Sequence, residues 1–257
     1  MTRVDSVLER LMRLERPLLL AFDVDGTLSP IVRDPDLARI PEETLRTLDE
    51  LAKSPVMKVA LITGRDLGSL SRMEQLNGIW RAVEHGGLVL APGDRPAPRG
   101  LKAEHEAALA RFRTWVDAHS EGAFIEYKPQ AIAVHVRAIA ETDPDRAERL
   151  LREADERARD LGLHVRRGKA LREAEAERQD KGNALREIFE RSGAKSVFFA
   201  GDDITDFSAI DFATQHGVGI FVRSEEQRGT PSAGADLLES VTEVAEVLSR
   251  LLDRIRS

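Results

Sequence analysis

The sequence predicts an α/β fold: a Rossmann-like, doubly wound parallel sheet with a separate α+β module inserted into it. Two observations lead to this prediction. Short, uninterrupted apolar runs alternate with segments of helical periodicity, and such runs are typical of strands buried on both faces of a parallel sheet. Between two stretches of this pattern lies a segment in which helices alternate with hairpins, and this order indicates an inserted α+β unit.

Hydrophobic spacing defines the elements of the main sheet and its helices. Apolar residues three or four apart predict a helix over residues 4–15 that Pro17 ends, and another over 41–53 that starts at Pro41. Further helices are expected from residue 180, over 204–215 and within 238–255. The strands are expected at 18–22, 57–62, 79–84, 196–200 and 217–222, with short ones at 88–91 and from Ala235 onward.

A linker marks the entry to the inserted module. Residues 92–100 hold three prolines and two glycines. The segment that follows predicts helices over 102–119 and 144–161, each followed by a hairpin, at 123–137 and 163–174 respectively. We therefore expect a core domain of residues 1–98 and 178–257, and an inserted αββαββ cap domain of residues 99–177.

The first hairpin of the insertion carries its charges on one face. Alternation separates Ile125 and Tyr127 from Glu126 and Lys128. A four-residue loop at 129–132 pairs Lys128 with Ala133 and Glu126 with His135. This register gathers Glu126, Lys128, His135 and Arg137 on one side. From the pattern alone, such a face is ordinarily a solvated surface with cross-strand ion pairs.

Composition excludes several classes of function. The 257 residues suit one large domain or two modest ones, and the net charge of −7 with no single-sign block gives no sign of nucleic-acid binding. The absence of cysteine excludes disulfides, thiolate metal sites and cysteine catalysis. No apolar run reaches the ~20 residues of a membrane span, and residues 1–16 lack the apolar stretch of a secretory leader. We expect a cytoplasmic protein, and a monomer, because no feature argues for an obligate dimer.

Polar residues follow four of the predicted strands. Because parallel strands bring such ends to one crevice, these residues are expected to meet there. Lys181 opens a helix, where the helix dipole disfavours a cation, so a carboxylate and a phosphate are expected beside it. Asp203 could simply cap the next helix. The four segments are Asp23-Val24-Asp25-Gly26-Thr27, Thr63-Gly64-Arg65, Glu84-His85-Gly86 and Gly201-Asp202-Asp203-Ile204-Thr205-Asp206.

These motifs resemble those of a known superfamily. Asp23-Val24-Asp25-Gly26-Thr27-Leu28 resembles the first motif of the haloacid dehalogenase superfamily of phosphohydrolases, and Thr63-Gly64-Arg65 resembles its second. Over about residues 18–250 the chain is similar to the trehalose-6-phosphate phosphatase family. That similarity rests on Glu126-Tyr127-Lys128-Pro129, His135-Val136-Arg137, Asp180-Lys181-Gly182 and the Gly-Asp-Asp-x-Thr-Asp segment that begins at Gly201.

The motifs and the resemblance together imply roles in hydrolysis of trehalose 6-phosphate. Asp23 and Asp202, with the backbone carbonyl of Asp25, supply the oxygen ligands that Mg²⁺ prefers. The resemblance makes Asp23 the nucleophile and Asp25 the acid and base. Thr63 and Lys181 hold the phosphoryl group, with Asp203 and Asp206 around the metal and its waters. The residues expected to bind substrate are Gly64, Arg65, Glu84, His85, Gly86, Glu126, Lys128, His135, Arg137 and Glu173.

Other functions are compatible with these motifs, and they differ either in the substrate or in the class of protein. Glu175 and Ala176 stand where the family usually has Arg-Pro, and Phe207 stands where it usually has Glu, so another sugar phosphate, such as that of sucrose or mannosylglycerate, is an alternative. A phosphomutase of the same fold is another. Outside enzymes, the chain could be a catalytically silent sugar-phosphate sensor or a structural partner of a trehalose-phosphate synthase. The presence of Asp23, Asp25, Thr63, Lys181 and Asp202 argues against both.

Overall fold

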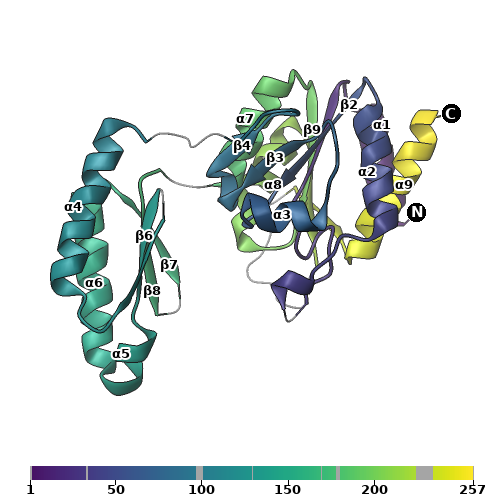
Figure 1. Cartoon of the computed structure of the whole chain (residues 1–257). Helices are drawn as coiled ribbons and strands as arrows, with labels where there is room; N and C mark the ends of the chain where they lie inside the picture. The colour runs from purple at the N-terminus through teal and green to yellow at the C-terminus, as the bar shows by residue number, and fades with distance from the viewer. Residues whose placement is uncertain are drawn as a thin grey trace. The chain divides into compact units, whose positions relative to one another are not determined.

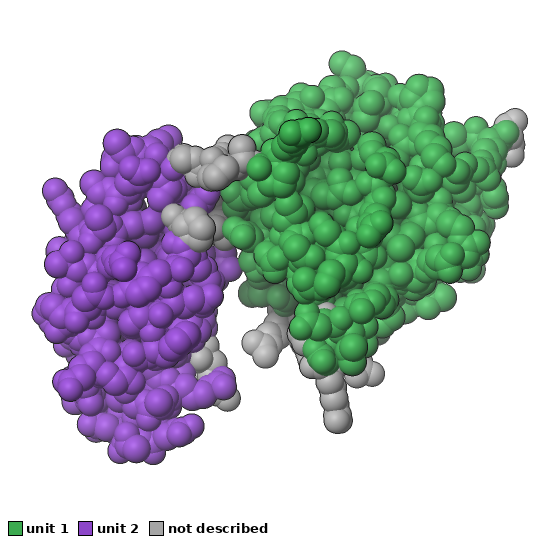
Figure 2. All heavy atoms as spheres, viewed as in Figure 1, with its two compact units in different colours: residues 1–97, 179–257 green, residues 98–178 purple. Residues whose placement is uncertain are grey.

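The chain forms two compact units, which are described separately below (Figure 2). One comprises Met1–Ala97 and Gln179–Ser257, and the other Pro98–Arg178. A computed structural model describes residues 2–32, 34–96, 101–128, 130–168, 170–177, 180–223 and 234–256. Within these ranges, no helix is long and apolar enough to cross a membrane.

The first unit contains a mostly parallel sheet that confirms the predicted fold class (Figure 1). In the described residues it has seven strands in the order β11-β10-β9-β1-β2-β3-β4, and only the β3–β4 pair is antiparallel. The central strand β1 lies between β9 and β2, so the ends of these three strands are neighbours. The strands are β1 Leu18–Phe22, β2 Met57–Ile62, β3 Trp80–Val83, β4 Leu88–Leu90, β9 Ser196–Gly201, β10 Gly217–Val222 and β11 Asp236–Leu238.

Helices cover both faces of this sheet (Figure 1). From β1, Leu18, Leu20 and Phe22 pack with α1, α2 and α9, whereas Leu19 and Ala21 pack with α7 and α8. This double burial explains why β1 is an unbroken apolar run. The helices are α1 Arg3–Arg13, α2 Glu42–Lys53, α3 Leu67–Met73, α7 Lys181–Ser192, α8 Phe207–His216 and α9 Val241–Arg256, with single 3₁₀ turns η1 Pro35–Leu37, η2 Glu84–Gly86 and η3 Ile204–Asp206.

The second unit is a four-stranded antiparallel sheet with helices on one face. The strand order is β5-β6-β8-β7, and the apolar face of the sheet packs on α4 and α6 through residues such as Ile132, Val134 and Phe112. The predicted αββαββ order is therefore present, with one further short helix, α5. The elements are α4 Ala103–His119, β5 Phe124–Tyr127, β6 Ala131–His135, α5 Arg137–Thr142, α6 Pro144–Asp160, β7 His164–Gly168 and β8 Leu171–Glu175.

The register predicted for the β5–β6 hairpin is wrong by two residues. Glu126 lies opposite Ala133, Phe124 lies opposite His135, and the backbone N–H of Lys128 donates to the carbonyl of Ala131 at 2.9 Å. Only positions 129 and 130 separate the paired ends, and Pro129 lies outside the described residues. A slip of two residues leaves every side chain on its expected face, so the charged face survives the error.

Arg137 does not lie on the second strand of the hairpin, as the alternation had predicted. Strand β6 ends at His135, and Arg137 is the first residue of α5, where it is exposed. The change of backbone from strand to helix breaks the two-residue period on which the prediction depended. Arg137 therefore does not share a strand face with Glu126, Lys128 and His135.

Candidate active site

A cavity of about 780 Å³ lies in the first unit, lined by residues that follow β1, β2, β3 and β9. This is the crevice that a doubly wound sheet provides at the carboxyl ends of its strands. The cavity brings together most of the residues that the sequence selected from the core. Those that line it are Asp23, Asp25, Thr63, Gly64, Arg65, His85, Lys181, Asp202 and Asp203.

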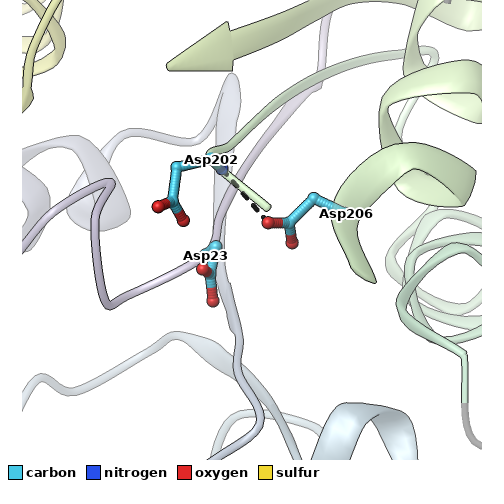
Figure 3. A group of neighbouring side chains, drawn as sticks. All are labelled: Asp23, Asp202 and Asp206. Atoms are coloured by element: carbon cyan, nitrogen blue, oxygen red, sulfur yellow. Dashed lines mark hydrogen bonds between the residues drawn. The ribbon is translucent and has the colours of Figure 1, made fainter. Parts of the chain in front are cut away.

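Three buried carboxylates converge at this site (Figure 3). Asp23, Asp202 and Asp206 each offer an oxygen, and the three oxygens lie within 4.8 Å of one another. The chain makes room for them at Gly26, whose φ is +79° and whose missing Cβ would lie 2.1 Å from Oδ2 of Asp202. Any other residue at Gly26 would collide with that carboxylate, which accounts for the glycine in the first motif.

Lys181 supplies the positive charge inside the cluster. Its Nζ lies 2.7 Å from Oδ1 of Asp206 and 2.9 Å from Oδ1 of Asp23, and the side chain is buried. Burial alone would lower the pKa of Lys181, but the carboxylates of Asp206 and Asp23 outweigh burial and raise that pKa. These contacts explain a lysine in the first turn of α7, which the helix dipole disfavours.

Asp206 connects Lys181 to the backbone of the loop that follows β9. Its Oδ2 accepts the backbone N–H groups of Asp202 at 3.1 Å and Asp203 at 3.0 Å, while its Oδ1 faces Lys181. Asp203 and Asp206 also form a reciprocal capping box around η3. Because both oxygens of Asp206 are engaged and Asp206 is not among the residues that line the cavity, we assign it to orienting its neighbours.

The charge balance of the cluster fits a divalent cation. Burial raises the pKa of Asp23 well above its usual value; Lys181 opposes this, and the carboxylates of Asp206 and Asp202 add to it. One ammonium group thus stands against three buried carboxylates, and buried charge of one sign is costly unless a counter-ion meets it. Asp23 and Asp202 both line the cavity, and oxygen donors suit hard cations such as Mg²⁺.

Asp25 has a different environment from Asp23, two residues earlier. Both of its carboxylate oxygens accept hydrogen bonds from Arg65, with Nε to Oδ2 at 2.6 Å and Nη2 to Oδ1 at 2.8 Å. Thr63 lies beside this pair, and its Oγ1 accepts a hydrogen bond from the backbone N–H of Arg65 at 3.1 Å. The hydroxyl hydrogen of Thr63 remains available to donate toward the cavity.

The turn after β3 brings His85 to the cavity in a strained backbone conformation. Glu84 and His85 have φ values of +53° and +55°, in the left-handed region that disfavours side chains. Gly64 makes space for the imidazole, since a Cβ there would lie 2.5 Å from Nε2 of His85. Glu84 is exposed, and neither Glu84 nor Gly86 is among the residues that line the cavity.

Several cavity residues were missed at the sequence level. Two apolar pieces of the lining carry a signal that the sequence offers: Ile31 and Val32 lie just after the first motif, and Ile204 interrupts a run of polar residues. Their exposed fractions are 43%, 41% and 55%, which is high for large apolar side chains. The missed lining residues are Ile31, Val32, Asp36, Ala38, Ser69, Ile204 and Thr205.

In the second unit, charged side chains gather on the sheet face opposite the helices. Lys128 Nζ lies 2.6 Å from Glu173 Oε1 and 3.9 Å from Glu126 Oε2, and His135 Nε2 lies 3.4 Å from that same Glu126 oxygen. We call Glu126, Lys128, His135 and Glu173 the cap cluster. Glu175, at a departure from the family motif, is buried on the same face and pairs with Arg166 at 2.8 Å.

The fold and this site are those of the haloacid dehalogenase type, and comparisons with known proteins identify the family of the chain. A sequence model described as trehalose-phosphatase matches residues 21–241. The chain is 33% identical over 249 residues to a trehalose-phosphate phosphatase of Mycobacterium ulcerans, which covers 91% of this chain and 61% of that protein. The chain belongs to the trehalose-phosphatase family.

Relatives of the chain differ in length and in name. The chain spans about three fifths of the length of the curated mycobacterial phosphatases it matches, and 19% of a Mycobacterium tuberculosis protein named as an uncharacterized glycosyl hydrolase, at 34% identity. A solved trehalose-6-phosphate phosphatase from Aspergillus fumigatus aligns with a TM-score of 0.78 at 25% identity, covering 99% of this chain and 98% of the other. A trehalose synthase regulatory protein domain from Candida albicans shares the fold, with a TM-score of 0.66 at 13% identity over 96% of this chain and 98% of the other.

Proposed function

We propose that this protein hydrolyses trehalose 6-phosphate to trehalose and inorganic phosphate in a Mg²⁺-dependent reaction. The observation that carries the proposal is the buried group of Asp23, Lys181 and Asp202, which lines a cavity in a chain of the trehalose-phosphatase family. A nucleophile, a fixed cation and a second carboxylate in one crevice are what transfer of a phosphoryl group to a side chain requires.

The Mg²⁺ ion would be held by Asp23, Asp202 and the backbone carbonyl of Asp25. When bound, Mg²⁺ would neutralise phosphate charge, so that an anionic carboxylate can approach an anionic substrate. Asp206 would keep Asp202 and Asp203 in place through the two amide hydrogen bonds that it accepts. Thr63 and Lys181 would hold the phosphoryl oxygens through the hydroxyl and the ammonium group.

The reaction would proceed in two steps on Asp23. In the first, a carboxylate oxygen of Asp23 bonds to phosphorus, the bond from phosphorus to the sugar oxygen breaks, and Asp25 gives a proton to that oxygen. In the second, water attacks phosphorus, Asp25 accepts a proton from the water, and the bond to Asp23 breaks. The geometry supports Asp23 as nucleophile, because it lies beside Lys181 in the buried cluster while Asp25 faces Arg65.

We propose the cap cluster as the part of the chain that recognises the sugar. Glu126, Lys128 and His135 are partly exposed and Glu173 is buried beside Lys128, and these groups match the hydroxyl groups of a saccharide in hydrogen-bonding capacity. On the core side, Gly64 and His85 at the cavity are proposed to contact the substrate. Glu84, Gly86 and Arg137, which family resemblance also selects, have less support because they lie outside the cavity and the cap cluster.

Phosphate release from a panel of sugar phosphates tests the proposal. The panel would include trehalose 6-phosphate, sucrose 6-phosphate, glucose 6-phosphate and mannosyl-3-phosphoglycerate, each with Mg²⁺ and with EDTA. We expect a strong preference for trehalose 6-phosphate and no release with EDTA. A preference for another sugar phosphate of the panel would agree with the mechanism and contradict the proposed substrate. The residues to test for specificity would then be Glu175, Ala176 and Phe207.

A non-catalytic role as a sugar-phosphate sensor is the alternative from another class of function. Because the Candida albicans regulatory domain shares the fold, the fold alone does not establish turnover. Binding of trehalose 6-phosphate without phosphate release would establish that alternative. The cytoplasmic location and the monomeric state stay predictions, which cell fractionation and light scattering would check.

A further inference from the structure

We propose that Arg65 is a positioning residue that holds the carboxyl group of Asp25 for proton transfer to and from the reacting oxygens. This inference rests on the proposed function, in which Asp25 is the acid and base. It gives Arg65 a different role from substrate binding, which family resemblance suggested. The two roles lead to different kinetics, so they can be separated by experiment.

The contact between the two side chains is bidentate. Nε and Nη2 of Arg65 donate to separate oxygens of Asp25, at 2.6 and 2.8 Å. Two parallel bonds to a charged acceptor fix the plane of a carboxylate as well as its position. Both residues line the cavity, with 12% of the Arg65 side chain and 38% of the Asp25 side chain exposed. The acid is accessible, whereas the guanidinium behind it is nearly buried.

Two hydrogen bonds fix the backbone of Arg65, one within its own loop and one to the turn after β3. Its N–H donates to Oγ1 of Thr63 at 3.1 Å, and its carbonyl accepts the N–H of Glu84 at 2.9 Å. Glu84 and His85 maintain this connection in left-handed backbone conformations, which cost free energy in residues with side chains. The strained turn after β3 thus helps to fix Arg65, which in turn holds Asp25.

The two-nitrogen contact favours the ionised form of Asp25, so one of its two bonds must give way when an oxygen of Asp25 takes a proton. When one oxygen of Asp25 carries the proton, the other can keep its bond to the guanidinium, so the carboxyl group stays in place. In the first step that proton passes to the sugar oxygen as its bond to phosphorus breaks, and in the second a proton from water returns to Asp25. A lysine has a single nitrogen and cannot hold both oxygens in one plane.

A leaving-group comparison separates positioning of Asp25 from binding of the phosphate. p-Nitrophenolate leaves phosphorus without a proton, whereas a sugar alkoxide needs one. The experiment measures the single-turnover rate of the first step, by rapid quench with trehalose 6-phosphate and by the burst of p-nitrophenolate from p-nitrophenyl phosphate. The variants are Arg65→Met, Arg65→Lys, Asp25→Asn and the double variant Arg65→Met/Asp25→Asn.

We expect Arg65→Met to slow the first turnover of trehalose 6-phosphate by about 10- to 100-fold, a part of what a general acid contributes, and to change the p-nitrophenolate burst by less than about threefold. Arg65→Lys should fall between wild type and Arg65→Met. The double variant should be no slower than Asp25→Asn alone, because residues that act through one another are not additive. The matched control is Arg81→Met, which removes a similar bidentate pair with Glu74, at 2.6 and 2.9 Å, outside the cavity.

Two results would overturn the proposal. Equal slowing of both substrates by Arg65→Met, or a slowing that adds to that of Asp25→Asn, would show that Arg65 binds the transferring phosphate directly. If Arg65→Met does not fold, the same comparisons with Arg65→Lys decide. A wild-type protein that releases no phosphate from either substrate would refute the proposed function and this inference with it, an outcome distinct from the other two.

Discussion

The two charged clusters of this protein differ in how their charges are held. In the first unit, Lys181 has 3% of its side chain exposed and lies between Asp23 and Asp206. In the second, Lys128 has 41% exposed and lies beside Glu173 and Glu126. Both are lysines flanked by two carboxylates, yet water screens one and hardly reaches the other.

The difference in burial suits the two clusters to different tasks. Buried charges cannot rearrange without a large cost, so the first cluster presents a fixed arrangement for chemistry. Lys128, Glu126 and His135 of the second cluster are partly exposed, so they can exchange their ion pairs for the hydroxyl groups of a ligand at lower cost, with Glu173 buried beneath them.

Replacing the nucleophile should have the largest effect. Asp23→Asn removes the attacking carboxylate, so we expect phosphate release from trehalose 6-phosphate to fall by about 10⁴-fold or more. The fold should persist because Lys181 keeps its contact with Asp206. Phosphate release and circular dichroism of the same sample check this, and unchanged turnover in the variant would contradict the mechanism.

The two lysines should differ in their contribution to stability. Lys181→Met leaves buried carboxylates without their cation, and we expect a loss of about 3–5 kcal/mol in the free energy of unfolding. Lys128→Met removes a half-exposed lysine and leaves one buried carboxylate, that of Glu173, without this partner, so it should cost less, about 1–2 kcal/mol. Urea denaturation in EDTA measures both. Similar losses in the two variants would contradict the contrast drawn between the clusters.

Binding of Mg²⁺ should stabilise the first cluster. A cation that binds only the folded chain raises the free energy of unfolding by about 2.7 kcal/mol at a concentration 100 times its Kd. Thermal unfolding with and without Mg²⁺ measures this gain. Asp202→Asn should remove most of it, whereas Glu126→Gln in the cap cluster should leave it unchanged. A gain of equal size in Asp202→Asn would place the ion elsewhere.

A change in the cap cluster should affect substrate choice more than chemistry. Glu173→Gln removes the charge that faces Lys128 at 2.6 Å. We expect about a tenfold lower kcat/KM for trehalose 6-phosphate, or about 1.4 kcal/mol. Turnover of p-nitrophenyl phosphate, which has no sugar to recognise, should not change. Equal losses on the two substrates would exclude a role in recognition.

A surface pair provides the smallest effect and a reference for the other two clusters. The backbone N–H of Thr2 and the guanidinium of Arg250 hold the pKa of Asp5 well below its usual value. The unfolded chain therefore binds a proton at higher pH than the folded chain does. The stabilisation by Asp5 is present above its unfolded pKa of about 3.9 and is lost as the pH falls through the lower folded value.

Asp5→Asn tests that sign. The difference in unfolding free energy between wild type and Asp5→Asn should be small near pH 6 and should shrink further between pH 4 and pH 2. Denaturant titrations at these pH values measure it. A difference that grows toward low pH would contradict the assignment.

The sequence predicted the buried cluster better than the exposed one, for physical reasons. Asp23 and Asp202 follow strands whose continuous apolar runs already place them at one edge of the sheet, and Lys181 stood out because a helix start disfavours it. The cap hairpin has no comparable constraint. Its register depends on the turn between Lys128 and Ala131, and a change of two residues preserves both faces.

Pairings made by long side chains could not be predicted from the sequence. The contact of Arg65 with Asp25 joins residues 40 positions apart, and neither spacing nor periodicity specifies it. The same is true of Arg166 with Glu175, which depends on the register of β7 and β8. The prediction for Arg137 was wrong for a different reason. Val136, between the end of β6 and the start of α5, is a residue type that gives no sign of a helix start.

Mass spectrometry of an acid-quenched single turnover would detect passage of the phosphoryl group through Asp23. Wild-type protein mixed with trehalose 6-phosphate and Mg²⁺ should yield a transient phosphorylated peptide that contains Asp23. The modification should be absent in Asp23→Asn and should persist longer in Asp25→Asn, because Asp25 is proposed to activate the water that removes it. Full turnover with no phosphorylated Asp23 at any quench time would contradict the account.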